Sequence, residues 1–324
     1  MAALYETETD YCKGPLGRLL PLRVSLANKT VGNVGSSILN ALLEADCFNI
    51  TVLVRRAEKK FSSKLSVRVT DFTSQSSVTE AVKGQDVVID ATVGPDPYDS
   101  LRLVDASLAS GVYRFVPSEF TSDPHEIRTR SLPLSQGKKR VYEYLQRLAS
   151  ENRITYTVLA TGAFLDWNLQ TGFMYIDLAR KTIDLLNDGT NVIPWTLLPV
   201  TGKAVVNALL CPERTKNRTC LIYNVQKSQK EVADLAKEAL GPDGWQTQRV
   251  DMEKVLEGAL SEWSAGNYNL KVIGDFIRYS NATPGFSGRF ETNDNELLGV
   301  KAMTDDEVKQ LIREIAENLK ASSN

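Results

Sequence analysis

The sequence predicts an α/β protein: a Rossmann-type, doubly wound parallel sheet with a smaller, mostly helical lobe. Three observations carry this prediction. Short apolar runs alternate with amphipathic stretches through the first half of the chain, a glycine-containing turn opens the first helical stretch at Gly32–Gly35, and the alternation stops near Thr161. The 324 residues suffice for one large α/β domain with an appended lobe.

The elements of the first half follow one another as strand, helix, strand. The strand-like runs lie at 22–27, 49–54, 65–69, 86–93, 113–116 and 154–159. The helical stretches repeat apolar residues every three or four positions and lie at 36–44, 78–82, 99–109 and 135–150. Strands that alternate with helices form βαβ units with right-handed crossovers, so the sheet should be parallel.

The second half follows a less regular pattern. Helical stretches lie at 204–210, 230–240, 251–264 and 305–321, with a strand at 219–225. These predict a lobe over residues 162–324 that packs on the carboxyl edge of the sheet and can return strands or helices to it. Residues 1–20 carry acidic side chains and no apolar signal-peptide core, so we expect a loosely attached tail there.

Composition and charge exclude several classes of partner. The net charge of −2 gives no overall field that would attract nucleic acid or an anionic membrane. No run of about 18 apolar residues is present, so the sequence predicts no membrane-spanning helix. The four cysteines form no C-x-x-C pair and indicate free thiols in a reducing, cytoplasmic compartment. Monomer and homodimer both remain open.

A glycine turn lies between the first strand and the first helix. It comprises Gly32, Asn33, Val34 and Gly35. Glycine lets backbone N–H groups approach a pyrophosphate at a helix N-terminus, so the turn predicts a dinucleotide-binding domain over residues 21–161. Lys29 stands where a G-x-x-G-x-x-G spacing places the first glycine. Its side chain would tilt the turn, weaken cofactor binding or reach to a phosphate, and the sequence leaves these alternatives open.

Two arginines follow the second predicted strand. In an NAD site, an acidic residue at this place binds the ribose 2′-hydroxyl. Arg55 and Arg56 stand there instead and suit a 2′-phosphate. We therefore expect NADPH as the cofactor, with Arg55 as the contact to that phosphate.

The next two strand ends predict further contacts at the same edge of the sheet. Thr92 and Val93 follow the fourth strand and are small enough for a cofactor to lie over them. Pro117 and Ser118 end the fifth strand abruptly, and the Ser118 hydroxyl could bond substrate or nicotinamide. Glu119 is open to two interpretations, a functional carboxylate or a solvated loop charge.

Lys138 lies on the apolar face of the helix predicted at 135–150. A spacing of 100° per residue places it with Val141, Tyr142 and Leu145, whereas Lys139 falls on the exposed face. Burial lowers the pKa of a lysine and suits it to proton transfer near neutral pH. The alternative is an ammonium that reaches past the end of the helix to water.

The second half is rich in aromatic residues that fit a pocket for a flat, apolar or phenolic ligand. They are Phe164, Trp167, Phe173, Trp195, Phe276, Tyr279 and Phe286. Each could equally belong to a core. Phe164 and Trp167 follow a predicted strand directly at its carboxyl end, so we expect these two, with Ser118, to bind the substrate.

Six segments together resemble a known family. They are T-V-G-N-V-G at 30–35, R-F-V-P-S-E-F at 114–120, G-K-K-R-V at 137–141, T-G-A-F-L-D-W at 161–167, G-K-A-V-V at 202–206 and N-D-N-E-L-L-G at 293–299. The chain resembles the NmrA-like family from about Ala27 to the C-terminus. Within it, the likeness is to the fungal branch of the isoflavone-reductase-like subfamily of atypical short-chain dehydrogenases.

This resemblance implies an NADPH-dependent reductase that transfers a hydride to an apolar or aromatic small molecule, in secondary metabolism. Lys138 matches the position of the family's catalytic lysine, and Arg55 that of its NADP-selecting arginine. The sequence departs from the family at Lys29, in the glycine loop, and at Thr121, where a glycine often follows P-S-E-F. The family name also implies an alternative, a non-catalytic NADP(H)-sensing regulator. Lys138 favours the enzyme, since a sensor needs no proton donor, whereas Lys29 favours the regulator or an inactive protein.

Other enzyme classes fit less well. An ordinary short-chain dehydrogenase needs Tyr-x-x-x-Lys on the helix after the fifth strand, but that spacing occurs only from Tyr223 to Lys227, in a predicted strand. A serine hydrolase is disfavoured because His125 is the single histidine and no G-x-S-x-G is present. A single histidine also disfavours a catalytic metal site.

Overall fold

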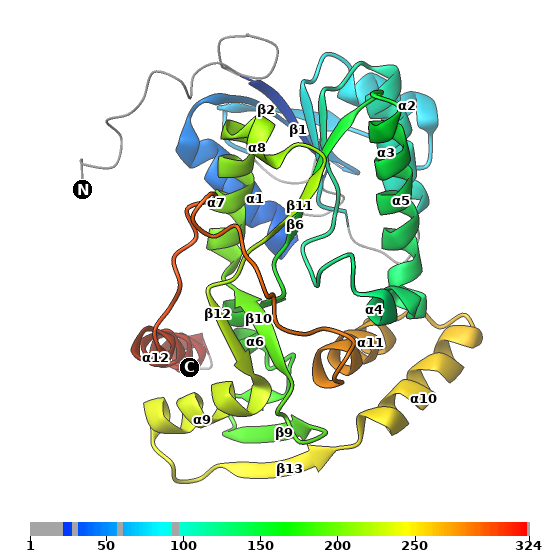
Figure 1. Cartoon of the computed structure of the whole chain (residues 1–324). Coiled ribbons are helices and arrows are strands. Elements are labelled where there is room, and N and C mark those ends of the chain that lie inside the picture. The colour runs from blue at the N-terminus through cyan, green and yellow to red at the C-terminus, as the bar shows by residue number, and fades with distance from the viewer. Residues whose placement is uncertain (1–21, 28–31, 57–60, 93–96, 323–324) are drawn as a thin grey trace.

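A seven-stranded parallel sheet forms the upper half of the molecule (Figure 1). Its strands, in spatial order, are β11 (Arg218–Leu221), β6 (Thr155–Ala160), β5 (Arg114–Val116), β4 (Val87–Asp90), β1 (Leu22–Ala27), β2 (Phe48–Val54) and β3 (Leu65–Val69). The order reverses between β1 and β4, which is the switch point where ligands of doubly wound sheets bind. The predicted fold class is confirmed.

The computed structural model describes residues 22–27, 32–56, 61–92 and 97–322. The predicted tail over 1–20, Lys29 and Val93 lie outside these ranges. In the part of the chain that is described, no helix is both long and apolar enough to cross a membrane.

Helices cover both faces of the sheet. They are α1 (Asn33–Ala45) and α7 (Leu198–Leu210) on one face, and α2 (Gln75–Val82), α3 (Tyr98–Ala109) and α5 (Gln136–Ser150) on the other. Each pair of layers buries its own apolar core, with Ile38 and Val205 in one and Leu103 and Leu145 in the other. The chain beyond residue 161 therefore returns α7 and β11 to the upper half.

Close packing of α1 against α7 depends on one glycine. A Cβ on Gly202 would lie 2.3 Å from the carbonyl oxygen of Ser37 on α1. Only glycine lets the two backbones approach this closely. The contact fixes α1, and with it the glycine turn at its start, relative to the sheet.

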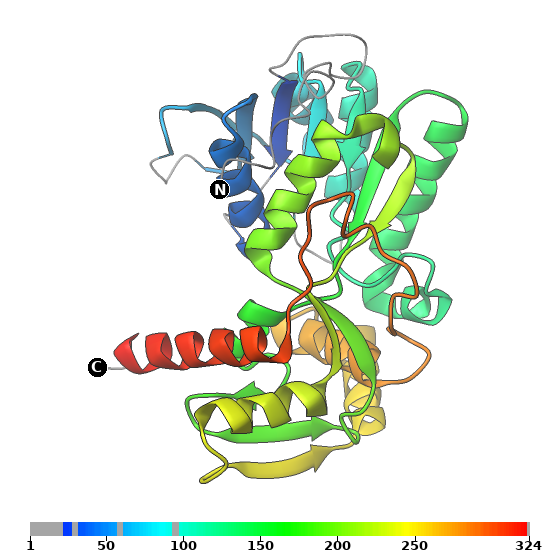
Figure 2. The ribbon, with the colours of Figure 1, turned by 60° about the vertical axis from the view of Figure 1, so that its left-hand side comes forward.

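The lower half holds two three-stranded sheets and the remaining long helices (Figures 1 and 2). Its strands are β7 (Ala163–Phe164), β8 (Ile176–Asp177), β9 (Thr182–Leu186), β10 (Val192–Thr196), β12 (Val225–Ser228) and β13 (Gln246–Val250). Its helices are α6 (Leu165–Thr171), α9 (Gln229–Leu240), α10 (Met252–Ser264), α11 (Leu270–Ala282) and α12 (Asp305–Ser322). The strand predicted at 219–225 is wrong in extent, because β11 and β12 belong to different sheets.

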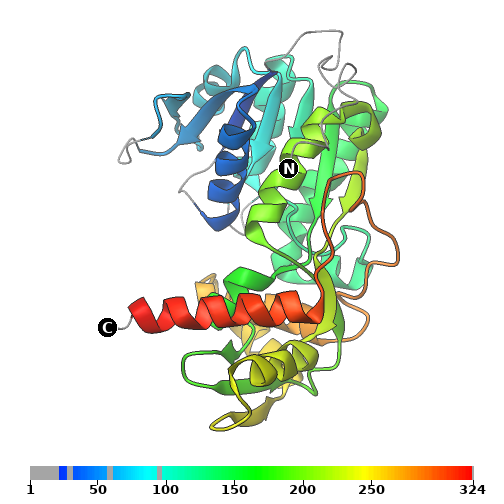
Figure 3. The same cartoon turned by 90° about the vertical axis from the view of Figure 1, so that its left-hand side faces the viewer.

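The lower half has a separate apolar core. Trp195 and Phe276 are buried in it, together with Ile312 of α12. Figure 3 shows α12 lying across the molecule between the two halves. Two short elements lie where the halves meet, namely α4 (Ile127–Ser131) and the 3-10 helix η1 (Pro133–Ser135), whereas α8 (Pro212–Thr215) connects α7 to β11 within the upper half.

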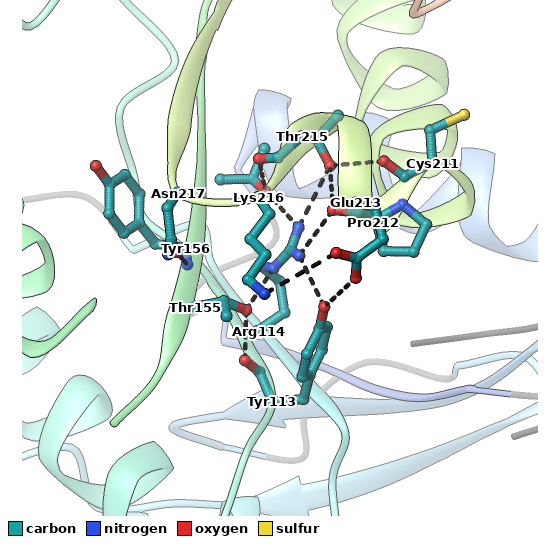
Figure 4. A network of polar contacts seen from close by, with 11 residues as sticks. Tyr113, Arg114, Thr155, Tyr156, Cys211, Pro212, Glu213, Thr215, Lys216 and Asn217 are labelled. Carbon is teal, nitrogen blue, oxygen red and sulfur yellow. Dashed lines mark hydrogen bonds and ion pairs between the residues drawn. The ribbon is translucent and has the colours of Figure 1, made fainter. Parts of the chain in front are cut away.

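The amino edge of the upper sheet is closed by a hydrogen-bonded network around Arg114 (Figure 4). Arg114 is 1% exposed, and its Nε and Nη1 donate to Thr155 Oγ1 and Thr157 Oγ1, both at 2.7 Å. Nη1 also donates to Thr215 Oγ1, while Nη2 donates to Pro212 O at 2.9 Å and to the Tyr113 hydroxyl. The guanidinium thus ties α8 to the starts of β5 and β6.

Candidate active site

The carboxyl ends of β4 and β5 are joined by hydrogen bonds. The buried carboxylate of Asp90 accepts from Thr92 N at 2.9 Å, from Thr92 Oγ1 at 2.6 Å and from Ser100 Oγ at 2.5 Å. Ser118 Oγ then donates to Thr92 O at 3.0 Å. The structure therefore brings together two residues that the sequence predicted at separate strand ends, Thr92 and Ser118.

Lys138 joins this network from the first turn of α5. Its Nζ donates to the backbone oxygen of Ser118. Burial lowers the pKa of Lys138, while the negative charges of Glu119 and Asp90 act against that decrease and the positive charge of Arg130 adds to it. Nζ thus points inward, toward the Ser118 carbonyl, as the helical spacing predicted, and the side chain as a whole is partly exposed.

Lys139, the next residue, is exposed and forms a 3.9 Å ion pair with Glu143 one turn along the helix. The two adjacent lysines thus differ as the helical spacing predicted. Only Lys138 is available to the interior of the site.

Glu119 and Arg130 form a buried, bidentate ion pair beside Lys138. Arg130 Nη2 donates to Glu119 Oε2 at 2.7 Å and Nη1 to Oε1 at 3.2 Å. The two side chains are 7% and 1% exposed for Arg130 and Glu119, respectively. The interpretation of Glu119 as a solvated loop charge is therefore wrong, since the carboxylate lies inside the site.

A cavity of about 210 Å³ opens between the carboxyl edge and α11. A cavity of roughly 150 Å³ with apolar walls is large enough to bind benzene. The space therefore suits a substituted ring. The polar wall includes Ser118, Glu119, Arg130 and Lys138, and the apolar wall includes Pro117, Leu132, Leu134, Val141, Ile273, Phe276 and Ile277.

The α11 wall was missed by the sequence analysis, which expected no helix at these residues. Asn269 caps α11, with its side chain accepting from the backbone N–H groups of Lys271 and Val272. Ile273, Phe276 and Ile277 recur at helical spacing and face the cavity. An asparagine cap followed by this spacing is the signal that could have located the helix.

Phe164 and Trp167 do not line this cavity. Phe164 packs against the upper core, and the Trp167 ring lies 4.9 Å from that of Phe173. Trp195 is fully buried in the lower core. A contact of Phe164 or Trp167 with substrate stays a prediction, whereas Phe276 is the aromatic residue of the predicted group that lines the cavity.

The start of α1 offers backbone donors to an anion. Gly32 is its N-cap residue, no side chain caps the helix, and its first turn carries no acidic residue. The first N–H groups of the helix therefore have no side-chain acceptor within the described chain. Asn33, Val34 and Gly35 form that first turn, and Arg55 lies exposed directly after β2. This donor set fits the pyrophosphate and 2′-phosphate of a dinucleotide.

Among curated proteins, the chain is 35% identical to an oxidoreductase of Aspergillus flavus, aprR, over 86% of this chain and 94% of the relative. It is 28% identical to the oxidoreductase poxI of Penicillium oxalicum, over 95% and 98% of the two chains.

Solved structures share the fold at low sequence identity. The NADPH complex of leucoanthocyanidin reductase from Vitis vinifera superimposes with a TM-score of 0.70 at 17% identity, covering 91% of this chain and 99% of that one. The NADP(H) complex of triphenylmethane reductase from Citrobacter gives 0.66 at 18% identity, covering 89% and 99%. The sequence model of the NmrA-like family matches residues 26–281 of this chain. The resemblance inferred from the six segments is confirmed, and the chain belongs to the NmrA-like family.

Proposed function

We propose that the chain is an NADPH-dependent oxidoreductase that reduces an apolar or aromatic small molecule, in secondary metabolism. The observation that carries the proposal is the placement of Lys138. It is a cation with a lowered pKa in the wall of a cavity, at the edge of the sheet where doubly wound folds bind ligands. The oxidoreductase names of the fungal relatives and the NADPH complexes of the structural neighbours support it.

The cofactor would lie across the carboxyl edge of the sheet. The start of α1 would bind its pyrophosphate and Arg55 its 2′-phosphate, and the nicotinamide half would lie toward Ser118 and Lys138. The full set of proposed contacts is Gly32, Asn33, Val34, Gly35, Arg55, Thr92, Val93, Pro117, Ser118 and Lys138. When bound, NADPH supplies a hydride.

Lys138 would supply the proton that completes the reduction. A reduced carbonyl or conjugated double bond leaves an anionic oxygen or carbon that must be protonated. The Ser118 carbonyl holds Lys138 Nζ in the cavity wall, and burial favours release of a proton from the ammonium. Ile273, Phe276 and Ile277 give the same cavity an apolar wall.

The test compares NADPH oxidation by wild type and Lys138→Met over a panel of enones and quinones. We expect turnover to fall by roughly 10²–10⁴-fold, because the proton donor is lost. NADPH binding, measured by calorimetry, should persist, weakened only by the loss of the one proposed contact from Lys138. Lys139→Met is the matched control, since it removes a neighbouring cation from the exposed face of the same helix.

Two outcomes would contradict the proposal. Equal rates in wild type and Lys138→Met would exclude a role for that lysine in proton transfer. NADPH binding by wild type without turnover of any panel member would favour the NADP(H)-sensing regulator.

A further inference from the structure

The ion pair between Glu119 and Arg130 is placed to act on Lys138. Both residues line the same cavity as Lys138 and are almost completely buried. A buried ion pair is weak evidence of stabilisation, because desolvation offsets most of the attraction between the charges. Its presence in a ligand-sized cavity therefore calls for another explanation.

The loop after β5 connects this pair to Lys138 through one peptide unit. Ser118 O accepts from Lys138 Nζ, and Glu119 is the next residue. Backbone bonds of 2.7 Å from Glu119 N to Pro117 O and from Thr121 N to Glu119 O hold the loop in a tight conformation. One short loop therefore carries both the carboxylate that Arg130 binds and the carbonyl that Lys138 contacts.

The charged groups that act on Lys138 come from three elements. Asp90 lies at the end of β4, Glu119 in the loop after β5, and Arg130 on α4. The α11 wall faces the cavity with Ile273, Phe276, Ile277 and Ser280, none of which carries a charge. The balance between ammonium and free amine at Lys138 thus depends on few charges, two of which belong to one ion pair.

We propose that Glu119 and Arg130 are positioning residues for Lys138: the carboxylate stabilises the ammonium, the guanidinium limits that stabilisation, and the pair holds the Ser118 carbonyl in place. The inference rests on the proposed function only for the use that Lys138 makes of its proton. Because Arg130 cannot lose its proton, it provides a permanent positive charge against which Glu119 acts.

The test measures the pKa of Lys138 directly. Lysines are labelled by ¹³C reductive methylation and titrated by NMR, and the Lys138 signal is identified by its absence in Lys138→Arg. Glu119→Gln should lower this pKa by about one unit or more, because the stabilising anion is removed. Arg130→Met should raise it, whereas Arg130→Lys, which keeps the charge, should leave it close to the wild-type value.

A second buried ion pair supplies the matched control. Arg278 Nη2 donates to Asp275 Oδ1 at 2.7 Å, and the two side chains are nearly as buried as those of Glu119 and Arg130. Neither residue lines the cavity. Asp275→Asn should destabilise the fold without shifting the Lys138 pKa.

The directions of the shifts decide the inference. A purely structural pair would lower stability in both single variants and would not shift the Lys138 pKa in opposite directions. Shifts of the same sign, or none in folded protein, would overturn the proposal. If one of the single variants does not fold, the double variant Glu119→Gln/Arg130→Met removes both charges together. The Lys138 pKa in the double variant should then lie closer to the wild-type value than the Lys138 pKa in the single variant that does fold.

Kinetics separate this inference from the proposed function. In active protein, the pH profile of kcat/KM should move with the NMR pKa. Opposite NMR shifts in a protein that never oxidises NADPH would sustain the positioning role and refute only the reductase proposal.

Discussion

Two cations, Arg114 fully buried and Lys138 partly buried, lie at opposite edges of the upper sheet, and their surroundings differ. Arg114, at the amino edge, donates hydrogen bonds from all three guanidinium nitrogens to side chains and a backbone oxygen (Figure 4). Lys138, at the carboxyl edge, donates one hydrogen bond within the described chain, to Ser118 O. A cation whose N–H groups all have acceptors in the protein stabilises the fold, whereas a cation with N–H groups that lack such acceptors can donate hydrogen bonds to a ligand.

The largest effect on stability is expected at the amino edge. Arg114→Met should lower the free energy of unfolding by about 3 kcal/mol, because it leaves buried hydroxyls and the Pro212 carbonyl without their donor. Chemical denaturation measures this change. Arg114→Lys, which keeps the charge without the planar fork, should recover only part of the loss. If Arg114→Met were as stable as the wild type, Arg114 would have no structural role that sets it apart from Lys138.

Lys138→Met should change stability in the opposite direction. Burial holds the pKa of Lys138 below its ordinary value of 10.5, so between the two values the unfolded chain binds a proton that the native state lacks. The free energy of unfolding of the wild type therefore rises with pH from the native pKa of Lys138 to 10.5. Below the native pKa, Lys138 is charged in both states, and the desolvation of its charge destabilises the native state most. The variant should be more stable than wild type at the low end of this range and equal to it above pH 10.5.

Urea titrations of both proteins across this pH range test the sign. A variant that is less stable than wild type at every pH would show that Lys138, like Arg114, serves mainly to hold the fold together.

The smallest effect is expected from an exposed cation at the same edge, Arg55. Arg55→Ala should weaken NADPH binding by about tenfold to a hundredfold, the range for one charge-assisted contact, and leave NADH binding unchanged. Calorimetry with both cofactors measures the difference. Arg56→Ala is the matched control, because it removes the adjacent exposed arginine. Equal weakening of NADPH and NADH would exclude a contact between Arg55 and the 2′-phosphate.

The upper half could be predicted from the sequence because its signals are local. Strands such as β2 are mostly apolar, and α5 has a helical spacing strong enough to give the orientation of Lys138. The lower sheets could not be predicted in the same way. Strands β7 and β8 span two residues each, too few for any periodicity to appear.

The candidate site was predictable only in part, for the same physical reason. Thr92, Ser118 and Lys138 follow or begin regular elements, so their edge of the sheet could be inferred. The ion pair between Glu119 and Arg130 could not be predicted, because Arg130 lies on a five-residue helix whose position depends on packing against the rest of the molecule. The α11 wall, in contrast, carries a local signal, the Asn269 cap and the helical spacing that follows it.

The return of β11 and α7 to the upper half has a consequence for any attempt to divide the molecule. An expression clone that stops at residue 161 would turn β6 into an edge strand, still paired with β5 but with no partner on the side where β11 lies. The clone would also lack α7, so the apolar residues of α1 that pack against α7 would be exposed to solvent. The upper half therefore cannot be cut from the rest of the chain at residue 161, and an exchange of this half between relatives would have to include α7 and β11 together with residues 22–161.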